Sequence, residues 1–304
     1  GEGRVGTGPM ADLLLVNDAD LTFAKIRLDE QSIATAISSV GDFEDSLARA
    51  LVWGSAWDMT RDAELSTGEY LQLVIGGLPH EGDVGVVQQL IRQLRTAIEL
   101  YAADDNRLRY QNTLAQNLRT LMNVAAPASD HQLAFARGFV ATASDAADLA
   151  RVGALYAGAT KLEGLAIDDE LRWAMLQRLV IMGELGDEAI DAELARDNTA
   201  TGMRHAQLVR AARPTAAAKA AAWDTALNDE GLANHLLAAT IGGIMIGEHR
   251  ELLRPHVEQY FDAIAPTWQR RTSEMAQQIV AGLYPIMLVE PATITRTEDY
   301  LHAH

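Results

Sequence analysis

The eight histidines are the first side chains to consider for catalysis, because paired imidazoles hold the zinc ion of helical hydrolases. A His-Glu-x-x-His motif places two histidines four residues apart on one helix face, with the glutamate beside them as general base. No two histidines of this sequence stand four residues apart, and only His302 and His304 lie close together. The sequence therefore predicts no metal ligands and no cofactor in this chain.

Other catalytic patterns also fail to appear in the sequence. There is no cysteine, which excludes a thiolate nucleophile, disulfides and cysteine-based metal centres. The glycines at 3–8 follow no predicted strand, and the glycines at 242–247 lack the Gly-Lys-Ser/Thr ending of a phosphate-binding loop. Carboxylate pairs such as Asp168-Asp169 precede helical stripes, where helix capping explains them. We predict no catalytic residue from these patterns.

The elements around these residues are predicted to be helices. Of the 304 residues, 48% are hydrophobic but only 6% are aromatic, and alanine, the best helix former, is abundant. Apolar residues recur at helical spacing over 71–78, 87–101 and 253–264. Ser66-x-x-Glu69 and Ser129-x-x-Gln132 are predicted capping boxes before such stripes. Short turns separate the stripes, so we expect a mainly α protein that forms an irregular HEAT- or armadillo-like α-superhelix.

The N-terminal residues differ from this pattern. Residues 1–9 lack periodicity and are interpreted as an expression scar or a disordered leader. Leu13–Val16 is a short apolar run, and Leu21–Leu28 alternates in the manner of a strand, so the two predict a short β-hairpin. Because two strands alone are marginally stable in water, they either pack on the helices or belong to a larger sheet.

The charge excludes several classes of partner. The chain carries 42 acidic and 25 basic residues, for a formal net charge of −17. Nucleic acid and anionic membranes both require basic surfaces, so neither is predicted as a partner. No apolar run approaches the ~20 residues of a membrane span, and no signal-peptide pattern begins the chain. We therefore expect a cytoplasmic location.

Two groups of segments carry a family resemblance. The first comprises 13–29, Asp45–Trp53 and Trp57–Asp62, and the second runs from Asp169–Trp173 to Trp223 through Arg196-Asp197-Asn198-Thr199. In their order and spacing, these segments resemble the C-terminal helical module of the bacterial aminopeptidase N group. That group belongs to the M1 family of zinc aminopeptidases, or gluzincins, and endoplasmic-reticulum aminopeptidases share the module. The resemblance covers nearly the whole chain after Met10.

The resemblance implies an organisation that the residues alone do not give. Residues 10–28 would end a β-sandwich domain, and 29–304 would form the C-terminal helical domain, a curved bowl that caps the active-site chamber. The implied partners are the upstream catalytic and β-sandwich domains and peptide substrates. The family's zinc-binding and substrate-amine motifs do not occur in this chain, so the implied Zn²⁺ belongs to a catalytic domain outside it. This chain alone should then be inactive, while the parent enzyme removes N-terminal residues from peptides.

Arginines are the residues we select as candidates for contact with a peptide, because a guanidinium group binds carboxylates in a two-pronged geometry. The candidates are Arg61, Arg172, Arg204, Arg210 and Arg213. A structural role is predicted beside each of them: Arg172 would pair with a protein carboxylate, and Arg61 would interact with a helix C-terminus. The other three would lie on a solvated face.

Two other functions are compatible with the same residues. A free-standing α-solenoid adaptor would bind a protein or peptide on its concave face, although the orphan strands argue against it. A self-contained all-α enzyme would have to use carboxylate chemistry. The upstream coding sequence separates these from the aminopeptidase hypothesis, which predicts both catalytic motifs before Leu13.

Overall fold

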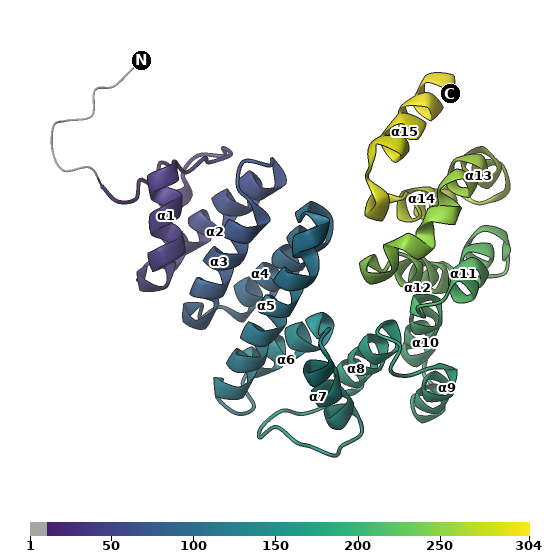
Figure 1. The fold of residues 1–304 in the computed structure, drawn as a ribbon, viewed down its shortest axis with the longest axis horizontal. Coiled ribbons are helices and arrows are strands. Elements are labelled where there is room, and N and C mark those ends of the chain that lie inside the picture. Colours follow the sequence, from purple (N-terminus) through teal and green to yellow (C-terminus); the bar gives the residue numbers. More distant parts are fainter. Residues whose placement is uncertain (1–10) are drawn as a thin grey trace. The chain divides into compact units, whose positions relative to one another are not determined.

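The structure, a computed structural model, describes residues 11–304 (Figure 1). The predicted leader at residues 1–9 lies outside the described residues. Within 11–304 all regular secondary structure is helical and no strand is formed, so the mainly α prediction is confirmed. None of these helices combines the length and apolar character needed to cross a bilayer. The described residues divide into two compact units, one that ends at Thr142 and one that runs from Ala143 to His304.

The N-terminal unit contains six α-helices within its described part. Their bounds are α1 (Glu30–Ser39), α2 (Ser46–Arg61), α3 (Thr67–Gly77), α4 (Val84–Thr96), α5 (Asp104–Val124) and α6 (Asp130–Thr142). Short 3₁₀ turns cover Asp18–Asp20, Val40–Asp42 and Leu78–His80, and a π-helical turn covers Ala97–Tyr101. Helices α1 and α3, α4 and α6, and α5 and α6 pack against each other.

Side-chain caps begin several helices where the sequence predicts them. Ser66 Oγ accepts from the backbone N–H of Glu69 at 3.2 Å, and the Glu69 carboxylate accepts from the Ser66 N–H at 3.1 Å, which confirms this capping box. At the second predicted box, Ser129 Oγ accepts from the Gln132 N–H at 3.1 Å, and the Gln132 side-chain oxygen accepts from the Ala128 N–H at 3.0 Å.

The stripe predicted at 87–101 is one helix in the sequence but two helical segments in the structure. Val87 and Ile98 are buried as expected, whereas Tyr101 is 43% exposed. The π-helical turn after α4 explains this difference, because a turn with i→i+5 bonds contains an extra residue and shifts the following side chains around the axis. The apolar period of the sequence therefore predicts which residues of α4 are buried, but it does not predict the exposure of Tyr101 after the π-helical turn.

The C-terminal unit contains nine α-helices. Their bounds are α7 (Ala146–Tyr156), α8 (Asp169–Ile181), α9 (Asp187–Arg196), α10 (Ala200–Ala212), α11 (Ala216–Asn228), α12 (Asn234–Ile244), α13 (Val257–Arg270), α14 (Ser273–Gly282) and α15 (Pro291–Ala303). Two 3₁₀ segments cover Gly247–His256 and Ile286–Leu288. The stripe predicted at 253–264 is thus shared between a 3₁₀ segment and α13.

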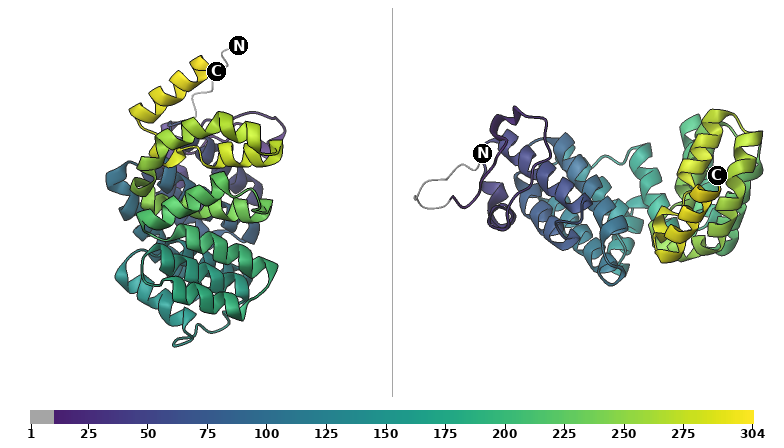
Figure 2. Two further views of the ribbon diagram at one scale, coloured as in Figure 1. Left: turned by 90° about the vertical axis from the view of Figure 1, so that its right-hand side faces the viewer. Right: turned by 90° about the horizontal axis from the view of Figure 1, so that it is seen from above.

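Helix α10 is central to the C-terminal unit. It packs against α8, α9, α11 and α12, and Figures 1 and 2 show α8, α10 and α12 in successive positions along the stack. The crossing of α10 and α12 is close because Gly243 has no side chain. A Cβ atom at this position would lie 2.2 Å from the carbonyl oxygen of Leu208 and 2.7 Å from the Cβ of Ala211. Small residues therefore set the distance between these two helices.

The predicted N-terminal β-hairpin is wrong. Residues 13–28 form no strand ladder, and only a 3₁₀ turn at Asp18–Asp20 interrupts the segment. The segment is held to α1 instead, because the Leu14 N–H donates to Ser32 Oγ at 3.0 Å. Phe23 is fully exposed and Leu21 is 88% exposed. Alternation predicts a strand only when another strand completes its hydrogen bonds. The assignment of 10–28 to a β-sandwich, and the HEAT- or armadillo-like superhelix, stay predictions.

Candidate functional site

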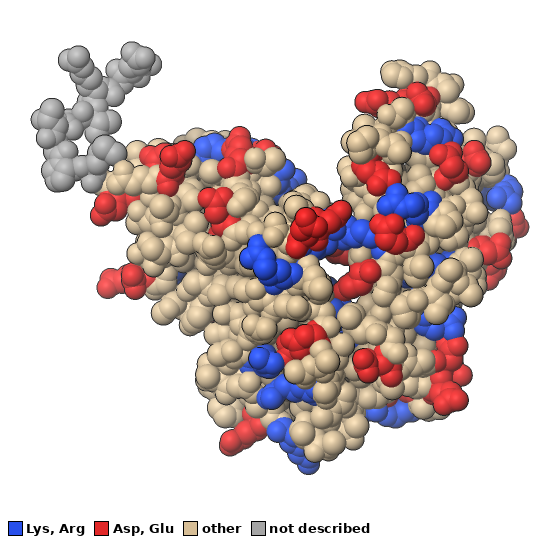
Figure 3. All heavy atoms as spheres, in the orientation of Figure 1, with Lys and Arg blue, Asp and Glu red and all other residues tan. Residues whose placement is uncertain are grey.

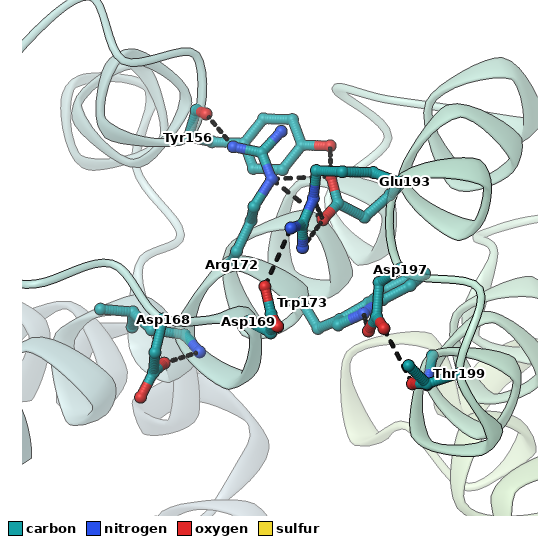
Figure 4. A network of polar contacts seen from close by, with 11 residues as sticks. Tyr156, Asp168, Asp169, Arg172, Trp173, Glu193, Asp197 and Thr199 are labelled. Carbon is teal, nitrogen blue, oxygen red and sulfur yellow. Dashed lines mark hydrogen bonds and ion pairs between the residues drawn. The ribbon is translucent and has the colours of Figure 1, made fainter.

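Arg172 lies in a polar network that joins α7, α8 and α9 (Figure 4). Asp168 caps α8 by accepting from the Leu171 N–H at 2.7 Å, which fixes the first turn that carries Arg172. Arg172 Nε donates to both carboxylate oxygens of Glu193, at 2.9 and 2.8 Å, and Nη1 donates to the carbonyl oxygen of Tyr156 at 2.8 Å. The prediction that Arg172 pairs with a protein carboxylate is confirmed.

Glu193 is the centre of this network, and its side chain is only 1% exposed. Besides Arg172, it accepts from Arg196 Nε at 2.6 Å and from the Tyr156 hydroxyl at 3.1 Å. Arg196 also pairs with Asp169 at 2.9 Å, which ties the end of α9 to the start of α8. A buried carboxylate is tolerated only when cations and donors compensate it, and Glu193 has both.

The network changes the protonation behaviour of its members. The hydrogen bond to Glu193 raises the pKa of Arg196. Burial, and then the charge of Glu193, raise the pKa of Tyr156. Both groups therefore keep their protons well beyond neutral pH. Neither Arg196 nor Tyr156 is therefore poised to exchange protons with a substrate near neutral pH.

Trp173 links the same region to α10. Its ring is 1% exposed, and Nε1 donates to Asp197 Oδ2 at 2.8 Å. Asp197 also accepts from the Thr199 hydroxyl at 2.8 Å, and the bond from Trp173 is the main cause that lowers the pKa of Asp197. Thr199 caps α10, and His205 of that helix stacks on Trp173 with ring centroids 5.5 Å apart. Trp173 thus forms an aromatic anchor between α8 and α10.

The other candidate arginines lie in separate places. Arg210 pairs with Asp191 at 2.6 Å and Arg213 pairs with Asp187, so both contact carboxylates of α9. Arg204 is exposed and has no ion pair within the described part of the chain. Arg204 lies six residues before Arg210 on the same helix, which corresponds to a rotation of about 240° around the helix axis. These arginines therefore do not form one cluster on one face.

Arg61 belongs to the N-terminal unit and lies 4.0 Å from Asp58 of its own helix, with its side chain 54% exposed. The peptide-contacting role of all five arginines stays a prediction. Arg172 is the candidate that the structure describes most fully: its side chain is 30% exposed, and Nη2 makes no hydrogen bond to a described residue. That nitrogen remains as a donor for an external carboxylate.

The sequence places Lys219 four residues before Trp223, a spacing at which the two side chains stack or pack, but it does not predict that the Lys219 charge is buried. Its side chain is fully buried, and Nζ donates to the carbonyl oxygens of Ala211, Gly243 and Ile244 at 3.0, 2.6 and 3.1 Å. These carbonyls end α10 and α12, where helix dipoles favour a cation. Burial lowers the pKa of Lys219 to about 8. The sequence also gives no sign that Glu193 is buried, because its helix carries several other acidic residues from which it cannot be distinguished.

The surface charges are mostly mixed. Figure 3 shows acidic and basic side chains next to each other on this face of the C-terminal unit, in keeping with the ion pairs between α9 and α10. Within residues 11–304 no group of three or more histidine, aspartate and glutamate side chains is arranged to hold a metal ion. The described residues therefore do not fit the zinc ion that the resemblance implies.

Comparison with known proteins places the chain in a family. The family model of the ERAP1-like C-terminal domain matches residues 13–304. The chain belongs to the ERAP1-like C-terminal domain family. It is also 49% identical over 289 residues to the protein named Aminopeptidase N of Streptomyces lividans, and the match covers 95% of this chain. The chain spans about a third (34%) of the length of that curated relative. The resemblance to the helical module of aminopeptidases is thus confirmed.

Proposed function

We propose that this chain is the non-catalytic helical domain of a zinc aminopeptidase, which caps the active-site chamber and helps to admit and hold peptides. The single observation that carries the proposal is the match to the ERAP1-like C-terminal domain family together with 49% identity to Aminopeptidase N of Streptomyces lividans. The activity of the parent enzyme, removal of N-terminal residues, is part of the same proposal. The family match favours it over a free-standing adaptor.

Two physical features support a role in holding peptides. The polar network of Glu193 fixes α8 and α9 relative to each other, so Arg172 keeps a donor at a defined position. The net charge of −17 favours approach of a positively charged peptide N-terminus, because a summed negative potential concentrates cations. Zinc would be held by residues of the parent enzyme outside 11–304. The cytoplasmic location stays a prediction.

The test compares the complete polypeptide that contains this chain with a version that ends before Asp29. Each is assayed on an aminoacyl arylamide and on a long peptide. We expect the shortened enzyme to lose preference between substrates of different length, because no helical domain encloses the peptide, and we expect this chain, added separately, to restore part of it. The proposal would be contradicted if the ratio of the kcat/KM values for the two substrates were the same in the complete and the shortened enzyme. So would an upstream reading frame without the two catalytic motifs.

A further inference from the structure

The N-terminal unit contains a partly open hollow that is lined by none of the five candidate arginines. It has a volume of about 280 Å³ and lies between the turn from α2 to α3 and the first turn of α5. Every residue that lines it is uncharged, although 22% of the chain is charged. The lining residues used below are Leu65, Thr67, Gly68, Tyr101, Asn106 and Tyr110.

Two local features of the backbone open this hollow. The π-helical turn Ala97–Tyr101 leaves Tyr101 partly exposed, with its ring 6.2 Å from that of Trp57. π-Helical turns recur at functional sites because they displace side chains from the helix period. On the opposite side, a Cβ atom on Gly68 would lie only 2.7 Å from the Tyr110 hydroxyl. Glycine at this position keeps Tyr110 in place and leaves the space empty.

The hollow combines unused polar atoms with an apolar base. The hydroxyls of Thr67, Tyr101 and Tyr110 make no hydrogen bond to any described residue. The side-chain oxygen of Asn106 accepts from Arg109 at 2.7 Å, which leaves its amide N–H groups as donors. Leu65 is 6% exposed at the base. Few precisely placed polar groups around an apolar surface are typical of a small-ligand site.

We propose that this hollow binds an uncharged, extended segment of a peptide, one or two residues long. The backbone carbonyl oxygens of the segment would accept from the Tyr110 hydroxyl and the Asn106 amide, and an apolar side chain would contact Leu65. A charged side chain would lose its hydration without gaining a counterion from the lining, because no lining residue is charged and the nearby Arg109 guanidinium is already engaged with Asn106 and the Tyr110 ring. The proposal rests on the proposed peptide-holding function and adds a preference for neutral residues at a distance from the scissile bond.

The test uses the full chain labelled with ¹⁵N and the capped peptide N-acetyl-Ala-Leu-Ala-amide. We expect saturable shifts of the backbone amides of 67–68 and 102–106. The matched peptides with glutamate or lysine in place of leucine should bind at least tenfold more weakly. Gly68→Leu should weaken binding at least tenfold, because the leucine side chain fills the hollow.

Tyr110→Phe keeps the ring and removes the hydroxyl, and it should weaken binding several-fold. Tyr284→Phe, in the C-terminal unit, is the matched control and should bind as the parent chain does.

Several outcomes would overturn the inference. They are the absence of saturable shifts at these amides, equal binding of the charged peptides, or unchanged binding by both Gly68→Leu and Tyr110→Phe. Shifts confined to α8–α10 would overturn this inference and leave the proposed function standing. Conversely, binding at the hollow combined with a complete enzyme whose substrate preference ignores the helical domain would overturn the proposed function alone.

Discussion

Two buried charges of the C-terminal unit, Glu193 and Lys219, are stabilised in different ways. Glu193 meets the full positive charges of Arg172 and Arg196 together with the Tyr156 hydroxyl. Lys219 is held chiefly by the partial charges of three backbone carbonyls at helix ends. Dipoles offset the cost of burial less completely than an opposite charge does, and the lowered pKa of Lys219 reflects this. We therefore expect the two groups to respond differently to substitution and to pH.

The largest expected effect is at Glu193. Glu193→Gln leaves two arginines without their buried counterion, and we expect a loss of about 3–5 kcal/mol in the free energy of unfolding. Urea denaturation followed by circular dichroism measures it. The exposed Glu184→Gln serves as the matched control and should change stability by less than about 0.5 kcal/mol. If Glu193→Gln lowered the free energy of unfolding no more than the control does, Glu193 and Lys219 would not differ in the way proposed.

The pH dependence of stability tests Lys219. Its folded pKa of about 8 lies below its ordinary value of 10.5, so between these pH values the unfolded chain binds more protons than the folded one. The free energy of unfolding should therefore rise with pH across this window, by at most about 1.4 kcal/mol per pH unit. The measurement is the difference between the parent chain and Lys219→Met at each pH. A difference that stays constant from pH 8 to 10.5 would show that the Lys219 pKa is not lowered.

Arg172→Gln should have an intermediate effect. It removes one of the two cations that compensate Glu193, while Arg196 remains, so we expect a loss of about 2 kcal/mol. Thermal unfolding at pH 7 measures this change, and Arg204→Gln is the control because that side chain is exposed and unpaired within residues 11–304. A double-mutant cycle with Glu193→Gln should give a non-additive coupling energy, whereas additive losses would indicate that the two residues act independently.

The smallest effect is expected for Lys219→Met at pH 7, with a loss of about 1 kcal/mol. The substitution leaves three carbonyl oxygens without a donor, but it also removes the cost of a buried charge, and these two changes oppose each other. Lys161→Met, at an exposed position, is the matched control in the same urea titration. A loss at Lys219 as large as that at Glu193 would mean that helix dipoles compensate a charge as well as ion pairs do.

The accuracy of sequence-based prediction varied with the range of the interactions involved. The capping box at Ser66 and the buried stripe of α4 depend on residues within a few turns, and both are confirmed. The N-terminal hairpin is wrong because a strand requires a partner that its own residues cannot supply. The pairing of Arg172 with a carboxylate was predicted, but its partner, 21 residues away, was not.

The amino-acid sequence alone is sufficient to show that the chain is helical, that its cysteine-free composition excludes thiol chemistry, and that it resembles the helical domain of M1 aminopeptidases. These properties follow from composition, local periodicity and the order of short motifs, which require no knowledge of distant contacts. The burial and compensation of Glu193 and Lys219, and the uncharged hollow beside Gly68 and Tyr110, become visible in the folded structure. Burial and the loss of solvent around a polar group depend on which helices meet, and the sequence pattern of a single helix does not specify its neighbours.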